Sequence, residues 1–221
     1  MNDKIKNNNE KILEIITRNI RWIILFICLI TVFVIIEDVF DNEIENFDVT
    51  CYNFLDKYII REKITPIVKV ITEIGSRYFV IPATIIVCAF IKNKKINIAF
   101  IVNLVIATIL NIILKNIFHR QRPTENILVV EKGYSLPSGH SMINMALYGF
   151  LIYLIFKRVK NKYVKWPLII LLSILVLLIG ISRIYLGAHY ASDVIAGFLI
   201  SIAYLALYTS LLKNFVKIEA E

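Results

Sequence analysis

Long apolar stretches separated by short polar connections dominate the chain. A membrane-spanning helix needs about 20 largely apolar residues, because it crosses a hydrocarbon core of about 30 Å at about 1.5 Å per residue. Six segments approach this length, and the second and fourth are short enough to need their flanking turns as well. They cover residues 22–39, 78–91, 96–114, 141–156, 166–184 and 194–212. The pattern predicts an all-α polytopic membrane protein with six transmembrane helices in a bundle.

A shorter helical pattern lies between the first and second spans. Apolar residues recur at helical spacing from Ile64 to Ile74, Thr65 is a candidate cap, and Pro66 suits the first helical position. We predict a short interfacial helix here. A helix packed on the bundle would give the same pattern.

The basic residues predict the orientation, because cytoplasmic connections carry the excess of Lys and Arg. The first apolar run ends in Glu37 and Asp38 instead of a cleavage site, so we interpret it as an uncleaved anchor. The connections expected outside are residues 40–77, 115–140 and 183–193. Cytoplasmic sites are expected for the polar N-terminus (1–21), Lys92, Lys94, Lys95, Lys157, Arg158, Lys160, Lys162, Lys165, Lys213 and Lys217. Both termini are therefore expected inside.

Composition agrees with a membrane protein of the cell membrane. The chain is 58% hydrophobic with a mean hydropathy of +0.70, whereas soluble domains are roughly 45–50% apolar. We expect one membrane-embedded domain over residues 1–221. The net charge of +8 is scattered between apolar runs, so no nucleic-acid partner is expected. Cys28 and Cys88 lie in apolar runs, and only Cys51 is in a polar connection, which predicts neither a disulfide framework nor a thiolate metal site.

Three cations stand at the ends of apolar helices in the two later outer connections. Lys115, Arg122 and Arg183 are costly there unless they are paired, reach the interface or serve a function. The guanidinium fork and the lysine point charge together suit a phosphoryl group. Charged membrane flanks are the alternative, which the positive-inside rule disfavours on the outer side.

The string Pro137-Ser138-Gly139-His140 directly precedes an apolar run and should form the first turn of the fourth span. Free backbone N–H groups and the helix dipole there make an anion site, and Gly139 permits close approach. Ser138 can donate to a phosphate oxygen or simply cap the helix. The predicted phosphate-binding residues are Lys115, Arg122, Ser138, Gly139 and Arg183.

Two histidines and one aspartate have the chemistry of a phosphoryl-transfer centre. His189 and Asp193 are four residues apart, so they share one face of a helix that begins near His189. The carboxylate can fix the tautomer of the ring and leave its other nitrogen free to attack phosphorus. His140 can protonate the leaving group and later deprotonate water. A structural His–Asp pair is the alternative, and His119 is given no role.

A metal site is not expected. Two-metal phosphatases need clustered carboxylates and histidines, and these connections offer only Glu125, Glu131 and Asp193 as acids. Three cations in one site would also repel a divalent ion. We predict hydrolysis without metal or cofactor.

These strings resemble the three signature motifs of the type 2 phosphatidic acid phosphatase family. The motifs read Lys, six residues, Arg-Pro; then Pro-Ser-Gly-His; then Ser-Arg, five residues, His, three residues, Asp. Every position matches, and the similarity covers roughly residues 65–205, with the motifs within 115–193. The matching residues are Lys115, Arg122, Pro123, Pro137, Ser138, Gly139, His140, Ser182, Arg183, His189 and Asp193.

The resemblance implies a membrane phosphatase with His189 as nucleophile, Asp193 as its orienter and His140 as acid and base. It implies a lipid phosphate or diphosphate as substrate, among them undecaprenyl diphosphate, phosphatidylglycerophosphate and phosphatidic acid, hydrolysed through a phosphohistidine at the extracytoplasmic face. Two alternatives remain open. One is a membrane-tethered phosphatase for soluble esters, and the other is a non-catalytic binder or transporter of anionic lipids.

Overall fold

All regular secondary structure within residues 2–212 of the computed structural model is helical. These are the residues that the structure describes, and it describes side chains from residue 19 onward, so Lys213 and Lys217 lie outside this part. The helices are α1 (Asn2–Phe40), α2 (Glu45–Tyr58), α3 (Thr65–Ile74), α4 (Arg77–Phe90), α5 (Lys94–Phe118), α6 (Gly139–Arg158), α7 (Lys162–Tyr185) and α8 (Ala191–Leu212). The expected all-α architecture is confirmed.

Five helices are long and apolar enough to cross a membrane on their own. They are the part of α1 from Asn19 to Phe40, and α5, α6, α7 and α8. The second predicted span, residues 78–91, corresponds to α4, which has only 14 residues and would rise about 21 Å. With α3 it passes the same test as one span bent by 50°. The chain is thus a multi-pass membrane protein, with five spans within the described residues, or six with the bent pair.

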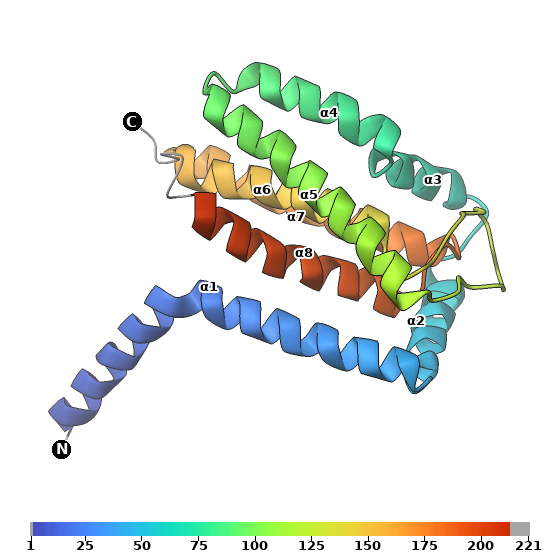
Figure 1. Cartoon of the computed structure of the whole chain (residues 1–221), viewed down its shortest axis with the longest axis horizontal. Helices are drawn as coiled ribbons and strands as arrows, with labels where there is room; N and C mark the ends of the chain where they lie inside the picture. Colours follow the sequence, from blue (N-terminus) through green and yellow to red (C-terminus); the bar gives the residue numbers. More distant parts are fainter. Residues whose placement is uncertain (1, 213–221) are drawn as a thin grey trace.

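The segment between the first and second spans holds two helices, of which the sequence predicted only one. The predicted helix is α3, which begins at Thr65 with Pro66 in its first turn and packs against α7. The additional helix is α2, which crosses the end of the bundle and contacts α7 and α8 (Figure 1). Its sequence is mixed in character, so hydropathy alone gave no signal for it.

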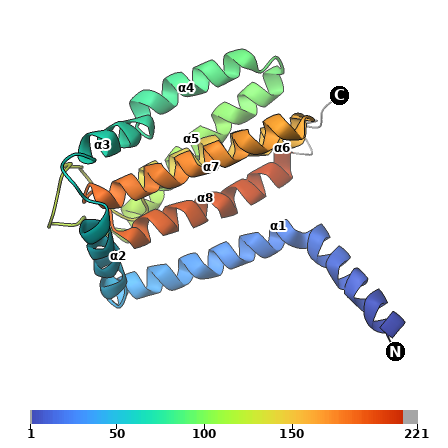
Figure 2. The same cartoon turned by 180° about the vertical axis from the view of Figure 1, so that it is seen from behind.

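Helix α6 lies at the centre of the bundle, between α5, α7 and α8 (Figures 1 and 2). Buried Phe150 packs on Phe100 of α5 with ring centroids 5.6 Å apart. Polar contacts also join the helices, since Asn103 donates to the Ala146 carbonyl at 2.8 Å and Ser201 to the Met142 carbonyl at 2.9 Å. Such bonds hold helices together in lipid, where apolar burial gives no preference for helix over lipid contact.

The outward faces of the spans are apolar. Phe33 of α1, Ile85 of α4, Ile112 of α5 and Leu171 of α7 are among the large apolar side chains that the protein itself leaves exposed. Patches of this kind are unusual on a soluble monomer. They match a surface that lipid covers.

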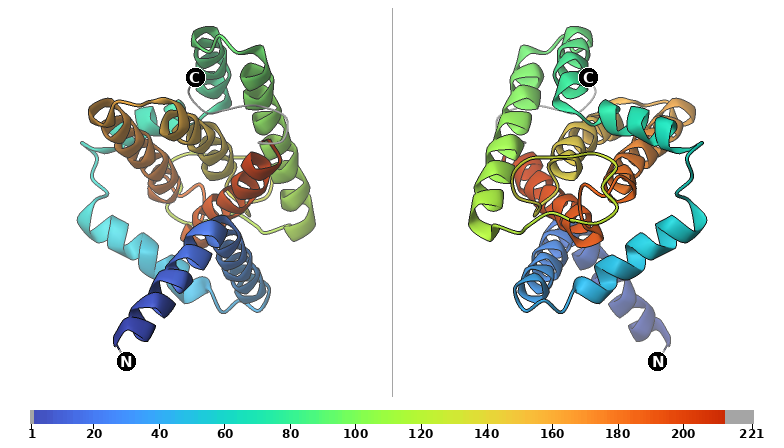
Figure 3. Two further views of the ribbon diagram at one scale, coloured as in Figure 1. Left: turned by 90° about the vertical axis from the view of Figure 1, so that its left-hand side faces the viewer. Right: turned by 90° about the vertical axis from the view of Figure 1, so that its right-hand side faces the viewer.

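One end of the bundle collects the segments that carry the polar strings. Helix α5 ends there, α6 begins, α7 ends and α8 begins, and α2 lies across it (Figures 1 and 3). The loop between α5 and α6, residues 119–138, covers this end together with the turn at residues 186–190. The lysine-bearing turns that join α4 to α5 and α6 to α7 lie at the opposite end.

Candidate active site

The three predicted cations come together at this end, and one loop contacts all of them. Lys115, in the last turn of α5, donates to the carbonyl oxygens of Tyr134 and Ser135. Arg122 donates to the Gly133 carbonyl at 2.9 Å and to the Lys132 carbonyl at 3.3 Å. The cation cluster, as we call Lys115, Arg122 and Arg183, is therefore framed by the stretch 131–135.

Arg183 is the deepest member of the cation cluster. It lies in the last turn of α7 with a relative exposure of 1%. Its guanidinium donates to Thr72 of α3 at 2.6 Å and pairs with the Glu131 carboxylate. Its Nε–H has no hydrogen-bond partner among the described residues. A buried donor of this kind is costly unless an acceptor such as an anion meets it.

The start of α6 faces the same place. Ser138 is its N-cap and accepts a hydrogen bond from the Ser141 N–H, so the capping role is present. The N–H groups of Gly139 and His140 have no acceptor within the helix. Asn111 of α5 holds this turn by donating to the Pro137 carbonyl at 3.1 Å. The geometry fits an anion site at the helix N-terminus.

Helix α8 is fixed to the start of α6. The Ser138 N–H donates to the Asp193 carbonyl at 3.1 Å. Gly197 permits this close contact, since a Cβ on it would lie 3.0 Å from the Ser138 carbonyl oxygen. The second and third sequence strings therefore meet, and His140 lies within electrostatic range of His189 and of the cation cluster.

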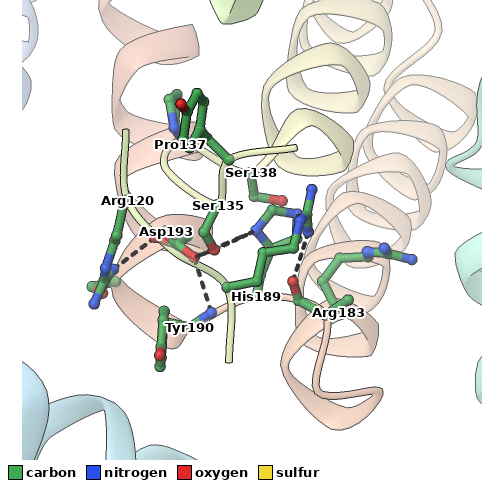
Figure 4. Close-up of polar contacts among 12 residues, drawn as sticks. Arg120, Ser135, Pro137, Ser138, Arg183, His189, Tyr190 and Asp193 are labelled. Carbon is green, nitrogen blue, oxygen red and sulfur yellow. Dashed lines mark hydrogen bonds and ion pairs between the residues drawn. The ribbon is translucent and has the colours of Figure 1, made fainter. Parts of the chain in front are cut away.

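His189 lies in the turn before α8 and is 3% exposed. Its Nδ1 is 3.4 Å from Asp193 Oδ2 and 3.3 Å from Ser135 Oγ (Figure 4). Its Nε2 is 3.1 Å from Arg122 Nη1. Arginine can only donate, so Nε2 is the acceptor and Nδ1 carries the hydrogen. The lone pair of Nε2 therefore points toward the cation cluster, as a nucleophile for a bound anion would.

His189 is neutral at ordinary pH. Burial is the main cause that lowers its pKa, and the nearby charges of Arg122 and Lys115 lower it further. Asp193 acts in the opposite direction through its hydrogen bond and its charge, and the resulting pKa is about 4. Near neutral pH the ring is thus deprotonated at Nε2, which is the form that nucleophilic attack requires.

The turn that carries His189 is shaped by its contact with the loop at residues 119–138. Gly187 has a φ of +65°, and a Cβ there would collide with the Asn126 backbone. The Leu128 N–H donates to the Leu186 carbonyl at 3.0 Å, and Arg122 Nη1 donates to the Ala188 carbonyl at 2.7 Å. These contacts hold the histidine beside the cation cluster.

Sequence reasoning missed several residues at this site. Arg120 and Ser135 donate hydrogen bonds to the Asp193 carboxylate, and Asp48 accepts one from Arg120. Arg120 was within the first string, but the arginine two residues later, Arg122, was assigned the role instead. Asp48 lies in the unpredicted α2. His119, which was given no role, is exposed and packs edge-on against the ring of Tyr134.

Two cavities reach the site from different sides. The larger, about 1370 Å³, lies between α3–α4 and α5 and has Gly139, His140 and Arg183 at one end. Its other lining is largely apolar, with Ile85 and Ile101 among the residues. The smaller, about 610 Å³, lies beneath α2 and reaches His189. The centre is thus a cluster of histidines and cations next to an apolar groove.

The fold and site define a multi-pass membrane protein with histidines and three cations gathered at one end of its bundle. The sequence profile described as the PAP2 superfamily matches residues 97–217. The chain belongs to the PAP2 superfamily, which confirms the resemblance seen in its three motifs.

Two curated relatives are similar to more than half of this chain. Phosphatidylglycerophosphatase B of Bacillus subtilis (strain 168) is 37% identical over 134 residues, which are 58% of this chain and 65% of the relative. Undecaprenyl-diphosphatase of Sulfolobus acidocaldarius is 32% identical over 136 residues, which are 59% of this chain and 62% of the relative. The matches thus span somewhat less than two thirds of either relative.

Two solved structures share the fold. The crystal structure of a transmembrane PAP2-type phosphatidylglycerolphosphate phosphatase from Bacillus subtilis aligns with a TM-score of 0.80 and 24% identity, over 87% of this chain and 98% of that one. LpxE of Aquifex aeolicus aligns with a TM-score of 0.57 and 24% identity, over 72% of this chain and 93% of that one. At this identity the likeness concerns the fold alone.

Proposed function

We propose that the chain is a metal-independent phosphatase that removes phosphate from a membrane lipid through a phosphohistidine intermediate. One observation carries the proposal: the buried His189 has its hydrogen-bearing Nδ1 on Asp193 and turns the unprotonated Nε2 toward Arg122. The remaining cations and the start of α6 lie around the same point. Membership of the PAP2 superfamily and the names of the two curated relatives support a lipid phosphate substrate.

Hydrolysis takes two steps at this centre. In the first, His189 Nε2 forms a bond to phosphorus, the phosphorus–oxygen bond to the lipid breaks, and His140 donates its proton to the leaving oxygen. In the second, His140 removes a proton from water, the water oxygen binds phosphorus, and the phosphorus–nitrogen bond breaks. Inorganic phosphate leaves, and His140 is again protonated.

The other site residues stabilise the charges that these steps create. Asp193 balances the positive ring of phosphohistidine through Nδ1. The phosphoryl oxygens are neutralised by Lys115, Arg122 and Arg183. These cations stabilise the transferring group most when it carries most negative charge. Ser138 and the first N–H groups of α6 add hydrogen bonds to the same oxygens.

The groove between α4 and α5 supports entry of the substrate from the side. His140 and Arg183 lie at its polar end, and the rest of its lining is mostly apolar. A lipid would keep its tails among these side chains while its phosphate reaches the cation cluster. The basic turns at the opposite end of the bundle support an extracytoplasmic site with both termini in the cytoplasm.

Metal-free catalysis is supported by the fact that the carboxylates at the site already have cationic or hydrogen-bonding partners. Asp193 is bound by Arg120 and faces His189, and Glu131 pairs with Arg183. A divalent cation at this point would meet three positive side chains instead of a carboxylate cluster. The residues present are suited to an anion.

Purified protein should release phosphate from a panel of lipids with EDTA present. The panel contains undecaprenyl diphosphate, phosphatidylglycerophosphate and phosphatidic acid, each compared with its water-soluble head-group phosphate. We expect turnover unchanged by EDTA and a preference for lipid over head group, because only the lipid fills the apolar groove. Loss of activity in EDTA would refute the metal-free mechanism, and equal turnover of the soluble esters would favour a membrane-tethered phosphatase for small substrates.

Glu131 should compete with phosphate for Arg183. Its carboxylate is partly exposed and pairs with Arg183, so an arriving phosphate must displace it. We expect Glu131→Gln to strengthen competitive inhibition by inorganic phosphate by about fivefold, the effect of removing a pair worth about 1 kcal/mol. Glu125→Gln, an exposed acid of the same loop, is the matched control. Weaker phosphate inhibition in Glu131→Gln would instead make Glu131 a support of the cluster.

A further inference from the structure

Arg120 bridges two buried carboxylates behind the proposed nucleophile. Its Nη1 lies 2.6 Å from Asp193 Oδ1, and its Nη2 lies 2.8 Å from Asp48 Oδ2 (Figure 4 shows the first contact). The side chain of Arg120 is 13% exposed, and those of Asp48 and Asp193 are 1% and 0% exposed. The guanidinium also lies over the ring of Tyr190, 4.2 Å from its centroid.

The two oxygens of Asp193 have different partners. Oδ1 accepts from Arg120, while Oδ2 accepts from Ser135 and from the Tyr190 N–H and faces His189 Nδ1. A carboxylate held at both oxygens cannot rotate freely. Arg120 therefore fixes the plane of the carboxylate in which Oδ2 meets the imidazole.

Asp48 holds this arrangement from α2. Its Oδ1 accepts from the Ser192 N–H at 2.8 Å, and its Oδ2 accepts from Ser192 Oγ at 2.7 Å as well as from Arg120. It thus binds both the residue before Asp193 and the cation that binds Asp193. A buried carboxylate needs such charged and hydrogen-bonded partners to remain ionised.

The charge of Arg120 is secure in this setting. Burial disfavours the charged guanidinium, but the carboxylates of Asp193 and Asp48 outweigh burial and raise the pKa of Arg120. Arg120 therefore stays positive throughout the catalytic cycle. One cation shared by two anions also leaves the group as a whole negative, which favours a positive imidazole ring on the other side of Asp193.

We propose that Arg120 and Asp48 are positioning residues for the nucleophile, which act through Asp193 and make α2 a working part of the active site. This inference rests on the proposed function, because it assigns a role relative to the phosphohistidine step. A purely structural role is the alternative, in which the same contacts only fasten α2 to α8. The two roles predict different results for a variant that still folds: the positioning role predicts a lower kcat, whereas a purely structural role predicts wild-type kcat.

The decisive variants change the network with little change in size. Arg120→Lys keeps the charge but cannot present a planar fork to two carboxylates. Asp48→Asn keeps the shape but removes the charge. Glu45→Gln is the matched control, an equal charge change at an exposed position of the same helix. Each protein is assayed in full length for lipid turnover, thermal unfolding and inhibition by orthovanadate and by inorganic phosphate.

We expect Arg120→Lys to lower kcat by about 10- to 100-fold, as loss of an outer orienting partner commonly does. The KM should stay within about twofold, because neither residue touches the cation cluster or the groove. Orthovanadate, which takes up five-coordinate geometry when it bonds to an imidazole nitrogen, should bind more weakly by the same factor as kcat falls. Inhibition by inorganic phosphate, which needs only the cations, should not change.

The double variant separates a shared pathway from two local effects. If both residues act through Asp193, Arg120→Lys combined with Asp48→Asn should lose little more kcat than Arg120→Lys alone, since contacting members of one network are not additive. Should Asp48→Asn unfold, Arg120→Lys with an unchanged melting temperature still carries the test.

Wild-type kcat and vanadate inhibition in a folded Arg120→Lys variant would overturn the positioning role, and so would a rise in KM and in the phosphate inhibition constant without a fall in kcat. A loss of kcat in the double variant equal to the product of the losses in the two single variants would refute the shared pathway. A wild-type protein that hydrolyses no lipid phosphate would instead refute the proposed function, before any variant is compared.

Discussion

Replacement of His189 with alanine is expected to abolish lipid phosphate hydrolysis, with kcat lower by on the order of 10⁴-fold or more, as for other covalent nucleophiles. The reason is that Nε2 of His189 is the atom that would bond phosphorus, and water in its place gains none of the orientation that Asp193 and Ser135 give the ring. Phosphate release from lipid vesicles or micelles measures the loss. With a lipid radiolabelled in its phosphate, samples quenched in alkali, where phosphohistidine is stable, show whether the label stays on the protein in the wild type alone.

His119→Asn is the matched control for this result. His119 is an exposed histidine that ends α5 with a φ of 49°, a conformation that asparagine also tolerates. It should retain wild-type turnover. If His189→Ala hydrolyses lipid as fast as His119→Asn, the phosphohistidine mechanism is wrong, and a non-catalytic lipid binder or a direct attack by water becomes the better account.

The spans could be predicted because the membrane imposes a strict rule on them. Each needs a long apolar run, and five of the six segments became single helices that meet the requirement by themselves. The segment at residues 78–91 was too short by that rule, and the structure extends it with α3 across a bend at Gly75 and Ser76. The sequence showed that this span was too short but did not predict the bend.

Helix α2 gave no hydropathy signal because its sequence is mixed in character, and the burial of one of its residues, Asp48, could not be predicted either. Asp48 is a carboxylate among exposed neighbours, and a sequence places such a residue on the surface by default. It is buried only because Arg120 and Ser192, which are remote in sequence, meet it. Contacts of this range depend on how the loops fold.

Much of the candidate site could be predicted because its charged residues stand next to apolar runs, whereas Asp48 does not. Lys115, Arg122 and Arg183 stand next to apolar runs, where a charge is conspicuous, and the structure gathers all three. Glu131 and Ser135 belong to a loop without periodicity, so nothing in their spacing shows which groups they contact. Their parts in the site came from the path of the loop at residues 119–138, which crosses the cluster.

Replacement of His140 with alanine is expected to affect substrates according to how readily their leaving group departs. A lipid alkoxide must be protonated as it leaves, so loss of the general acid should slow lipid turnover by roughly 10²- to 10⁴-fold. Para-nitrophenolate leaves without a proton, so His189 can still take the phosphoryl group from para-nitrophenyl phosphate. The second step stays slow, because water no longer has a base.

The variant should therefore release a rapid burst of about one equivalent of para-nitrophenol and then stall as phosphohistidine, since chemistry and breakdown of a covalent intermediate are separated by such kinetics. Stopped-flow absorbance measures the burst, and enzyme labelled with radioactive phosphate and quenched in alkali, where phosphohistidine is stable, measures the intermediate. His189→Ala should give no burst at all, which separates loss of the nucleophile from loss of the acid. Equal slowing of both substrates without a burst would remove His140 from the acid–base role and leave it as a phosphate-binding residue at the start of α6.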